Sequence, residues 1–242
     1  MNEAEWLTCD SPKLIIEYLE ARAYGRKLRL FAGACCRRIW KYLKRKDLRL
    51  MVEVSERYAD GLATNDELDA ADRKAGSAFA EVQWAAESDV DTNPARAAQW
   101  LAKPFTYGVA EQAAATFAAI ARDRDYKSRQ RKRTDGQPEP WEQVNNVYRE
   151  AEFTEEQHQL LLLKDIFGNP FRPVAFDPSW RTTTVVALAQ QMYDSRDFMP
   201  MPILADALQD AGCENVDILA HCRGEGPHVR GCWVVDLVLG KE

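Results

Sequence analysis

The sequence lacks any long apolar run. A membrane-spanning helix needs about 20 consecutive apolar residues, and the longest apolar stretches here are short ones such as residues 160–163. The N-terminal residues are polar and acidic, without the apolar core or the cleavage site of a secretory signal. These two absences predict a cytoplasmic protein that has no membrane segment.

Cysteine is sparse, at 6 of 242 residues, and two of the six are the neighbours Cys35 and Cys36. Disulfide frameworks belong mainly to small, cysteine-dense secreted domains, whereas the cytoplasm keeps thiols reduced. We therefore expect free thiols. No C-x-x-C pair occurs in the chain, so the spacing of a standard zinc finger is also missing.

The common catalytic signatures are missing as well. The sequence has no phosphate-binding loop, no Ser nucleophile elbow, no metalloenzyme signature and no paired carboxylates arranged for acid–base chemistry. This absence favours a non-enzymatic protein. An interaction module that binds another protein is therefore the leading interpretation of its function.

The overall composition is that of an ordinary globular protein. Apolar residues make up 46% of the chain and charged residues 29%, and 242 residues are enough to bury a core of normal size. The formal net charge is −6 and the isoelectric point is about 5.3. This balance favours solubility and argues against general binding of nucleic acid.

Helical periodicity dominates the chain, and strand signals are few. Apolar residues recur at helical spacing through most segments, beginning after Ser11 and Pro12, which resemble an N-cap and a first helical position. Further helices are predicted over residues 26–43, 47–58, 65–86, 95–103, 109–124, 141–150, 154–167, 185–194, 202–209, 215–222 and 227–239. The predicted fold is all-α, either one irregular multi-helix bundle or two helical subdomains.

Several helix ends are marked by capping residues. Residues 64–67 and 154–157 both match the capping box, in which a Thr oxygen and a Glu or Gln side chain bind free N–H groups reciprocally. Asn93 and Pro94 resemble an N-cap followed by a first helical position. The run 168–170 (Gly-Asn-Pro) predicts the end of the helix before it.

Residues 125–139 differ in kind from the segments on either side. They are rich in Lys and Arg, contain Gly136 and Pro138, and have almost no apolar side chains; Pro140 follows directly. This composition predicts an exposed loop or linker. It would separate an N-terminal helical subdomain at 1–124 from a C-terminal one at 140–242.

Four stretches together resemble an uncharacterised bacterial protein family. They are residues 26–40 (RKLRLFAGACCRRIW), residues 58–64 (YADGLAT), residues 165–173 (DIFGNPFRP) and residues 204–241, which contain the Cys- and His-rich end of the chain. The family has no assigned activity, so the resemblance implies no catalytic residues, substrate or cofactor.

The last thirty residues concentrate the side chains that can bind metal. Cys222, His228 and Cys232 offer three zinc ligands across a glycine-rich turn. The fourth ligand could be His221 or Cys213, or a cysteine from the pair at 35–36. The spacing matches no standard zinc pattern. Burial of the cysteines as small apolar side chains is therefore the favoured interpretation, and a structural zinc is the alternative.

The same segment allows two other functions. If residues 227–239 form a helix, then His228, Cys232 and Asp236 share one face, and the imidazole could activate the thiol of a Cys/His-dependent enzyme. The turn with Arg223 and Arg230 could instead bind a nucleotide or phosphate at the start of that helix. Both sites, within residues 222–236, are kept as alternatives to simple packing.

Basic residues gather in two segments, 22–49 and 122–133, although the chain as a whole is acidic. Such a polarised surface could bind nucleic acid, an acidic partner or the acidic part of the chain itself. The sequence shows no aromatic residues interleaved as a base-stacking platform. Nucleic-acid binding is therefore an alternative to the protein-interaction module, and a solvated helix face is the simpler explanation.

Overall fold

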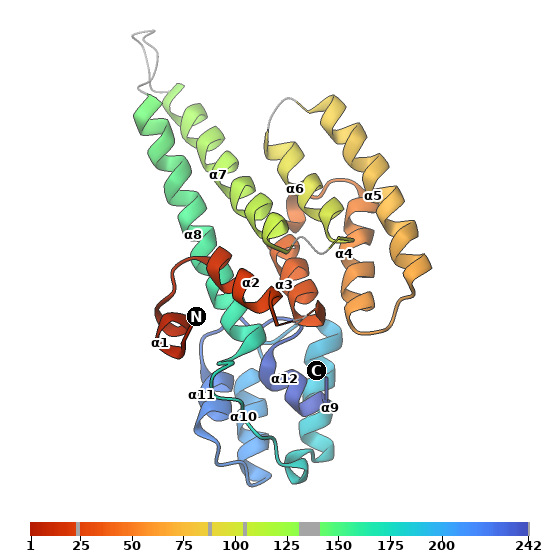
Figure 1. Cartoon of the computed structure of the whole chain (residues 1–242), viewed down its shortest axis with the longest axis vertical. Coiled ribbons are helices and arrows are strands. Elements are labelled where there is room, and N and C mark those ends of the chain that lie inside the picture. The colour runs from red at the N-terminus through yellow and green to blue at the C-terminus, as the bar shows by residue number, and fades with distance from the viewer. Residues whose placement is uncertain (23–24, 87–88, 104–105, 131–140, 242) are drawn as a thin grey trace. The chain divides into compact units, whose positions relative to one another are not determined.

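A computed structural model of the chain describes residues 1–22, 25–86, 89–103, 106–130 and 141–241 (Figure 1). The described residues are 75% helical and form twelve α-helices and two short 3-10 helices, without any strand. The prediction of an all-α, multi-helix fold is confirmed. None of the helices in these ranges combines the length and the apolar composition that crossing a bilayer requires.

The chain divides into two compact units. One, the central unit, comprises Asp10–Leu160, and the other, the terminal unit, combines Met1–Cys9 with Leu161–Glu242. The two units part within α8 (Trp141–Phe167), whereas the sequence suggested a boundary at residues 125–139. Helix α7 (Thr106–Gln130) includes the first residues of that suggested linker, and residues 131–139 lie outside the described residues.

The central unit is built around closely packed helices (Figure 1). Its other elements are α2 (Pro12–Glu20), α3 (Gly25–Arg38), the 3-10 helix η1 (Trp40–Tyr42), α4 (Lys46–Ala59), α5 (Asn65–Ala85) and α6 (Asp89–Trp100). Helices α6 and α7 contact each other extensively, and both bury small side chains such as Ala97, Ala98 and Ala113. Small side chains allow two helix backbones to approach closely.

The terminal unit packs short helices around its own apolar core. Its elements are α1 (Glu3–Thr8), the end of α8, the 3-10 helix η2 (Pro178–Trp180), α9 (Thr183–Ser195), α10 (Met201–Asp210), α11 (Val216–Arg223) and α12 (Trp233–Leu239). Helix α12 lies against α9, and α10 lies against both α9 and α11. The core includes Val234, Val235 and Val238 of α12, which are fully or almost fully buried. The C-terminal helix thus closes this core.

Two of the predicted caps, at Asn93 and at Thr154, lie inside helices and not at their starts. Thr64 does form its capping box with Glu67. Thr154 instead lies inside the continuous helix α8, and its hydroxyl donates to the carbonyl of Glu150 one turn earlier. Pro94 also lies inside a helix, because α6 begins at Asp89. A local motif therefore marks a helix start only when the preceding residues are not themselves helical.

Candidate metal centre

Four side chains of metal-ligating type converge in the terminal unit. They are Asp165 in the last turn of α8, His221 in α11, and His228 and Cys232 in the loop before α12. One ligand atom from each residue lies within 4.8 Å of the other three. These four residues are referred to below as the Asp165 cluster.

The short distances in the Asp165 cluster show which atoms face one another. His228 Nδ1 lies 2.8 Å and His221 Nε2 lies 3.2 Å from Asp165 Oδ1. His221 Nε2 also lies 3.1 Å from Cys232 Sγ. Neighbouring ligand atoms of a tetrahedral zinc site are about 3.3–3.6 Å apart, because the bonds are about 2.0–2.3 Å long. The three short distances lie below this range and the four atoms lie within 4.8 Å of one another, so the cluster could hold a metal ion once its side chains adjust.

Contacts around the cluster fix the orientation of its ligands. The backbone N–H of Val229 donates to Asp165 Oδ2 at 2.9 Å, which turns Oδ1 toward the two histidines. The His221 ring lies against the Trp233 ring, with 5.1 Å between centroids. Such outer contacts hold a ligand in the orientation that the metal needs. The arrangement therefore has the supporting contacts of a metal site as well as its ligands.

The cluster is closed to solvent on most sides. The side chains of Asp165 and His228 are 3% and 8% exposed, His221 is 18% exposed, and Cys232 is fully buried. Among the described residues, His228 Nε2 has no hydrogen-bond partner although it is buried. A buried polar atom without a partner costs about 1–3 kcal/mol.

The Cys232 thiol is held in its neutral form by its surroundings. Burial raises its pKa well above the ordinary value, and the nearby Asp165 carboxylate raises it further. A cation bound between these groups would reverse both effects, because a coordinating thiol loses its proton to the metal. The thiol can therefore act as a metal ligand only if the bound cation takes the place of its proton.

The structure brings together two of the three predicted zinc ligands. His228 and Cys232 belong to the Asp165 cluster, and His221, considered as a fourth ligand, joins them. Cys222 and Cys213 do not belong to the group and lie in the apolar core of the terminal unit. Burial raises the pKa of Cys222 to about 12, as expected for a cysteine that acts as a small apolar side chain.

The remaining ligand, Asp165, was missed by the sequence analysis. It precedes His228 by 63 residues, and no spacing rule connects a carboxylate in the middle of the chain with ligands near its end. Cys35 and Cys36, the other proposed sources of a fourth ligand, are buried in α3 of the central unit. The one available signal was that Asp165 opens a stretch dense in Gly, Asn and Pro at the end of a long helix.

The predicted catalytic stripe of His228, Cys232 and Asp236 is wrong in its geometry. Helix α12 begins only at Trp233, so His228 and Cys232 precede it and do not share a helical face with Asp236. Gly231 has a φ of +95°, which no right-handed helix allows. The raised pKa of Cys232 is also the reverse of what an activated nucleophile needs.

The two arginines of the predicted anion site in the same loop contact other groups of the protein. Arg223 donates to Asp206 and Gln209 of α10. Arg230 lies over the ring of Tyr193, 4.6 Å from its centroid. Neither guanidinium therefore marks the start of α12 as an anion site, and α12 itself has only seven residues.

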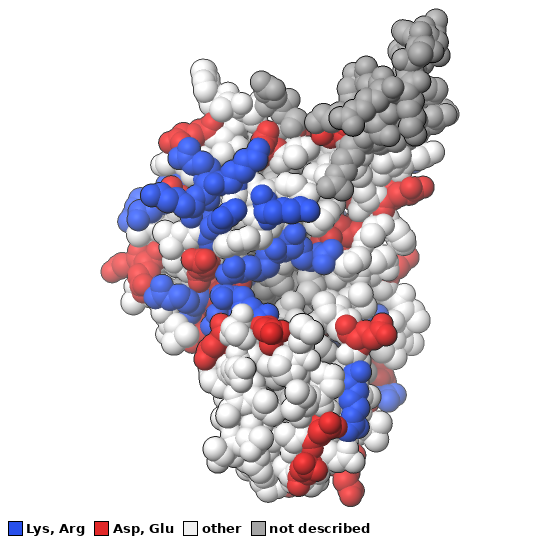
Figure 2. Space-filling model, turned by 180° about the vertical axis from the view of Figure 1, so that it is seen from behind, with Lys and Arg blue, Asp and Glu red and all other residues white. Residues whose placement is uncertain are grey.

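Many basic side chains of the segment 22–49 are paired within the central unit. Arg26 pairs with Asp60, Arg37 with Glu56 and Arg38 with Glu155, and each guanidinium approaches its carboxylate within 3.0 Å. Other Lys and Arg side chains gather on one face of this unit, with acidic ones among them (Figure 2). The basic side chains of the segment 122–133 lie outside the described ones.

Gly168 lies against Trp233, whose ring contacts His221 of the cluster. Its substitution gives a first test of the local packing. It follows α8 with a φ of +61°, and a Cβ there would lie 3.1 Å from Cγ of Trp233. We expect Gly168→Ala to destabilise the protein by about 2 kcal/mol or more, from backbone strain and displacement of the indole. Urea denaturation measures the loss.

Gly61 provides the matched control for this substitution. It has a similar φ of +70°, but a Cβ there meets nothing within 4 Å. Gly61→Ala should therefore cost only the strain, about 1–2 kcal/mol. Equal losses in the two variants would show that the contact between Gly168 and Trp233 has no energetic weight.

Comparisons with known proteins do not place this chain in a family. No family model matches it, and neither a curated protein nor a solved structure matches it. What can be concluded about the site thus comes from its own geometry: a buried Asp/His/His/Cys group that can hold a metal ion.

Proposed function

We propose that the chain is a non-enzymatic, cytoplasmic interaction module whose terminal unit is held together by one zinc ion. The observation that carries the proposal is the closure of the Asp165 cluster. Its four ligand atoms come from three separate segments, lie within 4.8 Å of one another and are largely buried.

The donor types of the cluster favour zinc over other common cations. Magnesium and calcium take oxygen ligands almost exclusively, whereas this group has two imidazole nitrogens and one sulfur. Zinc accepts Cys sulfur, His nitrogen and carboxylate oxygen in one tetrahedral set. Unlike iron and copper, zinc has no redox chemistry, which suits a purely structural role.

A structural role fits the number and burial of the ligands. Catalytic zinc sites typically use three protein ligands and leave a fourth position open to water or substrate. Here four protein side chains could fill all four positions, and Asp165, His228 and Cys232 have little or no contact with solvent. The ion would then act by joining segments and not by activating water.

Zinc bound in this way would order the loop between α11 and α12. That loop contributes His228 and Cys232, while α8 contributes Asp165 and α11 contributes His221. Fixing the loop also fixes Trp233, the first residue of α12, against His221. The proposed biological role is to present a rigid helical surface to another protein, with the metal providing the rigidity.

The metal content of the purified chain tests the zinc part of the proposal. We expect about one equivalent of zinc per chain after preparation without chelators, because structural sites bind tightly. Cobalt introduced in its place should show the absorption of a tetrahedral ion with a sulfur ligand. Plasma mass spectrometry and absorption spectroscopy measure the two quantities.

Two cysteine variants make this test specific. Cys232→Ser should lose the cobalt–sulfur absorption and most of the bound zinc. Cys222→Ser alters an equally buried thiol outside the cluster and should keep both. Wild-type protein with less than about half an equivalent of any divalent metal would refute the proposal.

A further inference from the structure

The central unit has a pocket that is lined in part by residues of the basic segment 22–49. It has a volume of about 270 Å³ and lies between η1, α4, α5 and α6. Its lining comprises Tyr42, Lys44, Arg45, Leu48, Val82, Ala85, Ala86, Asp91 and Ala95. We refer to it as the Lys44 pocket.

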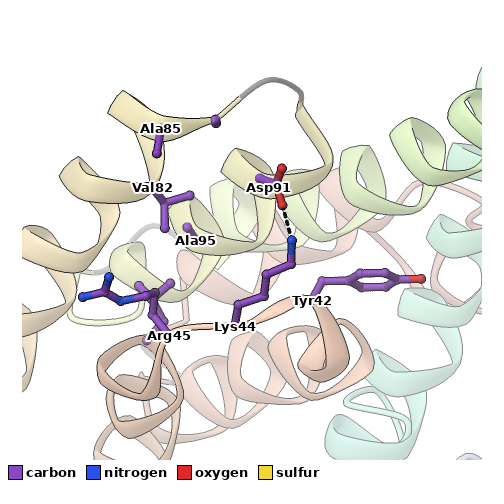
Figure 3. A pocket seen from close by; sticks show the side chains of 9 residues that line it. Tyr42, Lys44, Arg45, Val82, Ala85, Asp91 and Ala95 are labelled. Atoms are coloured by element: carbon purple, nitrogen blue, oxygen red, sulfur yellow. Dashed lines mark hydrogen bonds and ion pairs between the residues drawn. The ribbon is translucent and has the colours of Figure 1, made fainter.

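The wall of the Lys44 pocket is apolar, whereas its rim is charged. Figure 3 shows Val82 and Ala85 of α5 and Ala95 of α6 forming one side of it. Lys44 reaches from the short link between η1 and α4 toward Asp91 of α6, and their charged atoms are 2.6 Å apart. The pocket thus combines a small aliphatic surface with a cation at its edge.

Four of the six residues from 41 to 46 are cations: Lys41, Lys44, Arg45 and Lys46. Lys44 pairs with Asp91, and Arg45 pairs with Glu81 at 2.6 Å. In the part of the chain that the structure describes, neither Lys41 nor Lys46 has a carboxylate partner, and both are exposed. Lys41 and Lys46 do not line the pocket, but they stand next to its lining residues in the sequence and add positive charge that Asp91 and Glu81 do not neutralise.

The size of the Lys44 pocket indicates what kind of group it can take. Sites for whole small-molecule ligands are usually about 300–1,000 Å³, and this pocket is smaller. It is large enough for one bulky apolar side chain. A single buried anchor surrounded by a charged rim is the arrangement typical of a protein–peptide contact.

The neighbouring aromatic rings favour a peptide over nucleic acid. Single-stranded nucleic acid stacks its bases on open aromatic faces. Here the Trp40 ring lies under Arg37, at 4.2 Å, and the Tyr42 ring lies under Lys41, at 4.9 Å. These faces are covered by cations and are not open for bases to stack on.

We propose that the Lys44 pocket binds an acidic protein segment that carries one large apolar anchor side chain. The anchor enters between α5 and α6, and flanking carboxylates lie against Lys41, Lys44 and Lys46. An incoming carboxylate can displace Asp91 from Lys44 at little cost, because exposed ion pairs contribute little to stability. This inference rests on the proposed interaction role and names its partner, but it does not depend on the zinc.

Fluorescence anisotropy with defined peptides tests the inference on the full chain. The probes are two labelled peptides of about 12 residues, rich in Asp and Glu, with either Phe or Gly at the centre. We expect the Phe peptide to bind at least about 10-fold more tightly, because only its side chain is buried. Binding of both peptides should weaken as salt rises.

Three variants separate the anchor from the charge. Val82→Glu places a carboxylate in the pocket and should reduce the affinity for the Phe peptide to that for the Gly peptide. The double variant Lys41→Glu/Lys46→Glu should weaken both peptides about equally. Lys74→Glu, on an exposed position of α5 that does not line the pocket, should leave both affinities unchanged.

Three results would overturn the inference. They are equal affinities for the Phe and Gly peptides, no binding of either at about 1 mM, the weak end of specific recognition, and tighter binding of an oligonucleotide of the same charge. Metal analysis stays independent of these results, since the Asp165 cluster belongs to the terminal unit. If the chain binds zinc but neither peptide, the structural metal is supported and the peptide partner is refuted. If it binds the Phe peptide but no zinc, only the peptide partner is supported.

Discussion

Removal of the metal from the Asp165 cluster should lower the melting temperature by about 8–16 °C. A ligand present at about 1,000 times its dissociation constant stabilises the folded state by about 4 kcal/mol. For a chain of this size, each kcal/mol shifts the melting temperature by about 2–4 °C. Thermal melts followed by circular dichroism, with added zinc and with a chelator, measure the difference.

Variants at the cluster show whether this shift arises at the proposed ligands. His228→Ala removes a ligand whose side chain is 8% exposed, and its melting temperature should no longer respond to the chelator. Cys222→Ser should retain the full response, because Cys222 lies outside the cluster. A wild-type melting temperature that stays constant after measured loss of the metal would contradict a structural role.

The positions of most helices followed from local sequence signals, although α1 was not predicted and α8 takes the place of two predicted helices. The capping box at Thr64 and the Gly-Asn-Pro run after Phe167 marked real helix ends, because each acts through neighbouring residues only. The same logic failed at Pro94 and Thr154. There the surrounding residues continue a helix that tertiary packing stabilises, and a local cap has no free N–H groups to bind.

Three of the four residues of the candidate site could be named from the sequence, and the fourth could not. His221, His228 and Cys232 are near one another in sequence, so their clustering could be noticed before any fold was known. Asp165 joins them through tertiary contacts that no spacing rule encodes. The error about the start of α12 has a local cause, since Gly226 and Gly231 adopt positive φ values and keep the loop extended up to Cys232.

In the central unit, the largest expected effect of a single substitution is at Arg38. Its guanidinium donates two hydrogen bonds to Glu155, of 2.7 and 2.6 Å, and the Glu155 side chain is only 2% exposed. Arg38→Met keeps much of the apolar stem but leaves this carboxylate buried without its cation. The expected loss in the free energy of unfolding is about 3 kcal/mol, measured by urea denaturation.

Replacing both members of the pair distinguishes the buried charge from lost packing. In the double variant Arg38→Met/Glu155→Leu no charge is left in the interior, so most of the stability lost in Arg38→Met should return. If the loss came from packing of the Arg38 stem near Phe117, the double variant would stay as unstable as the single one. The difference between the two variants therefore measures the cost of burying Glu155 without a partner. A value near zero would mean that solvent reaches this carboxylate once Arg38 is removed.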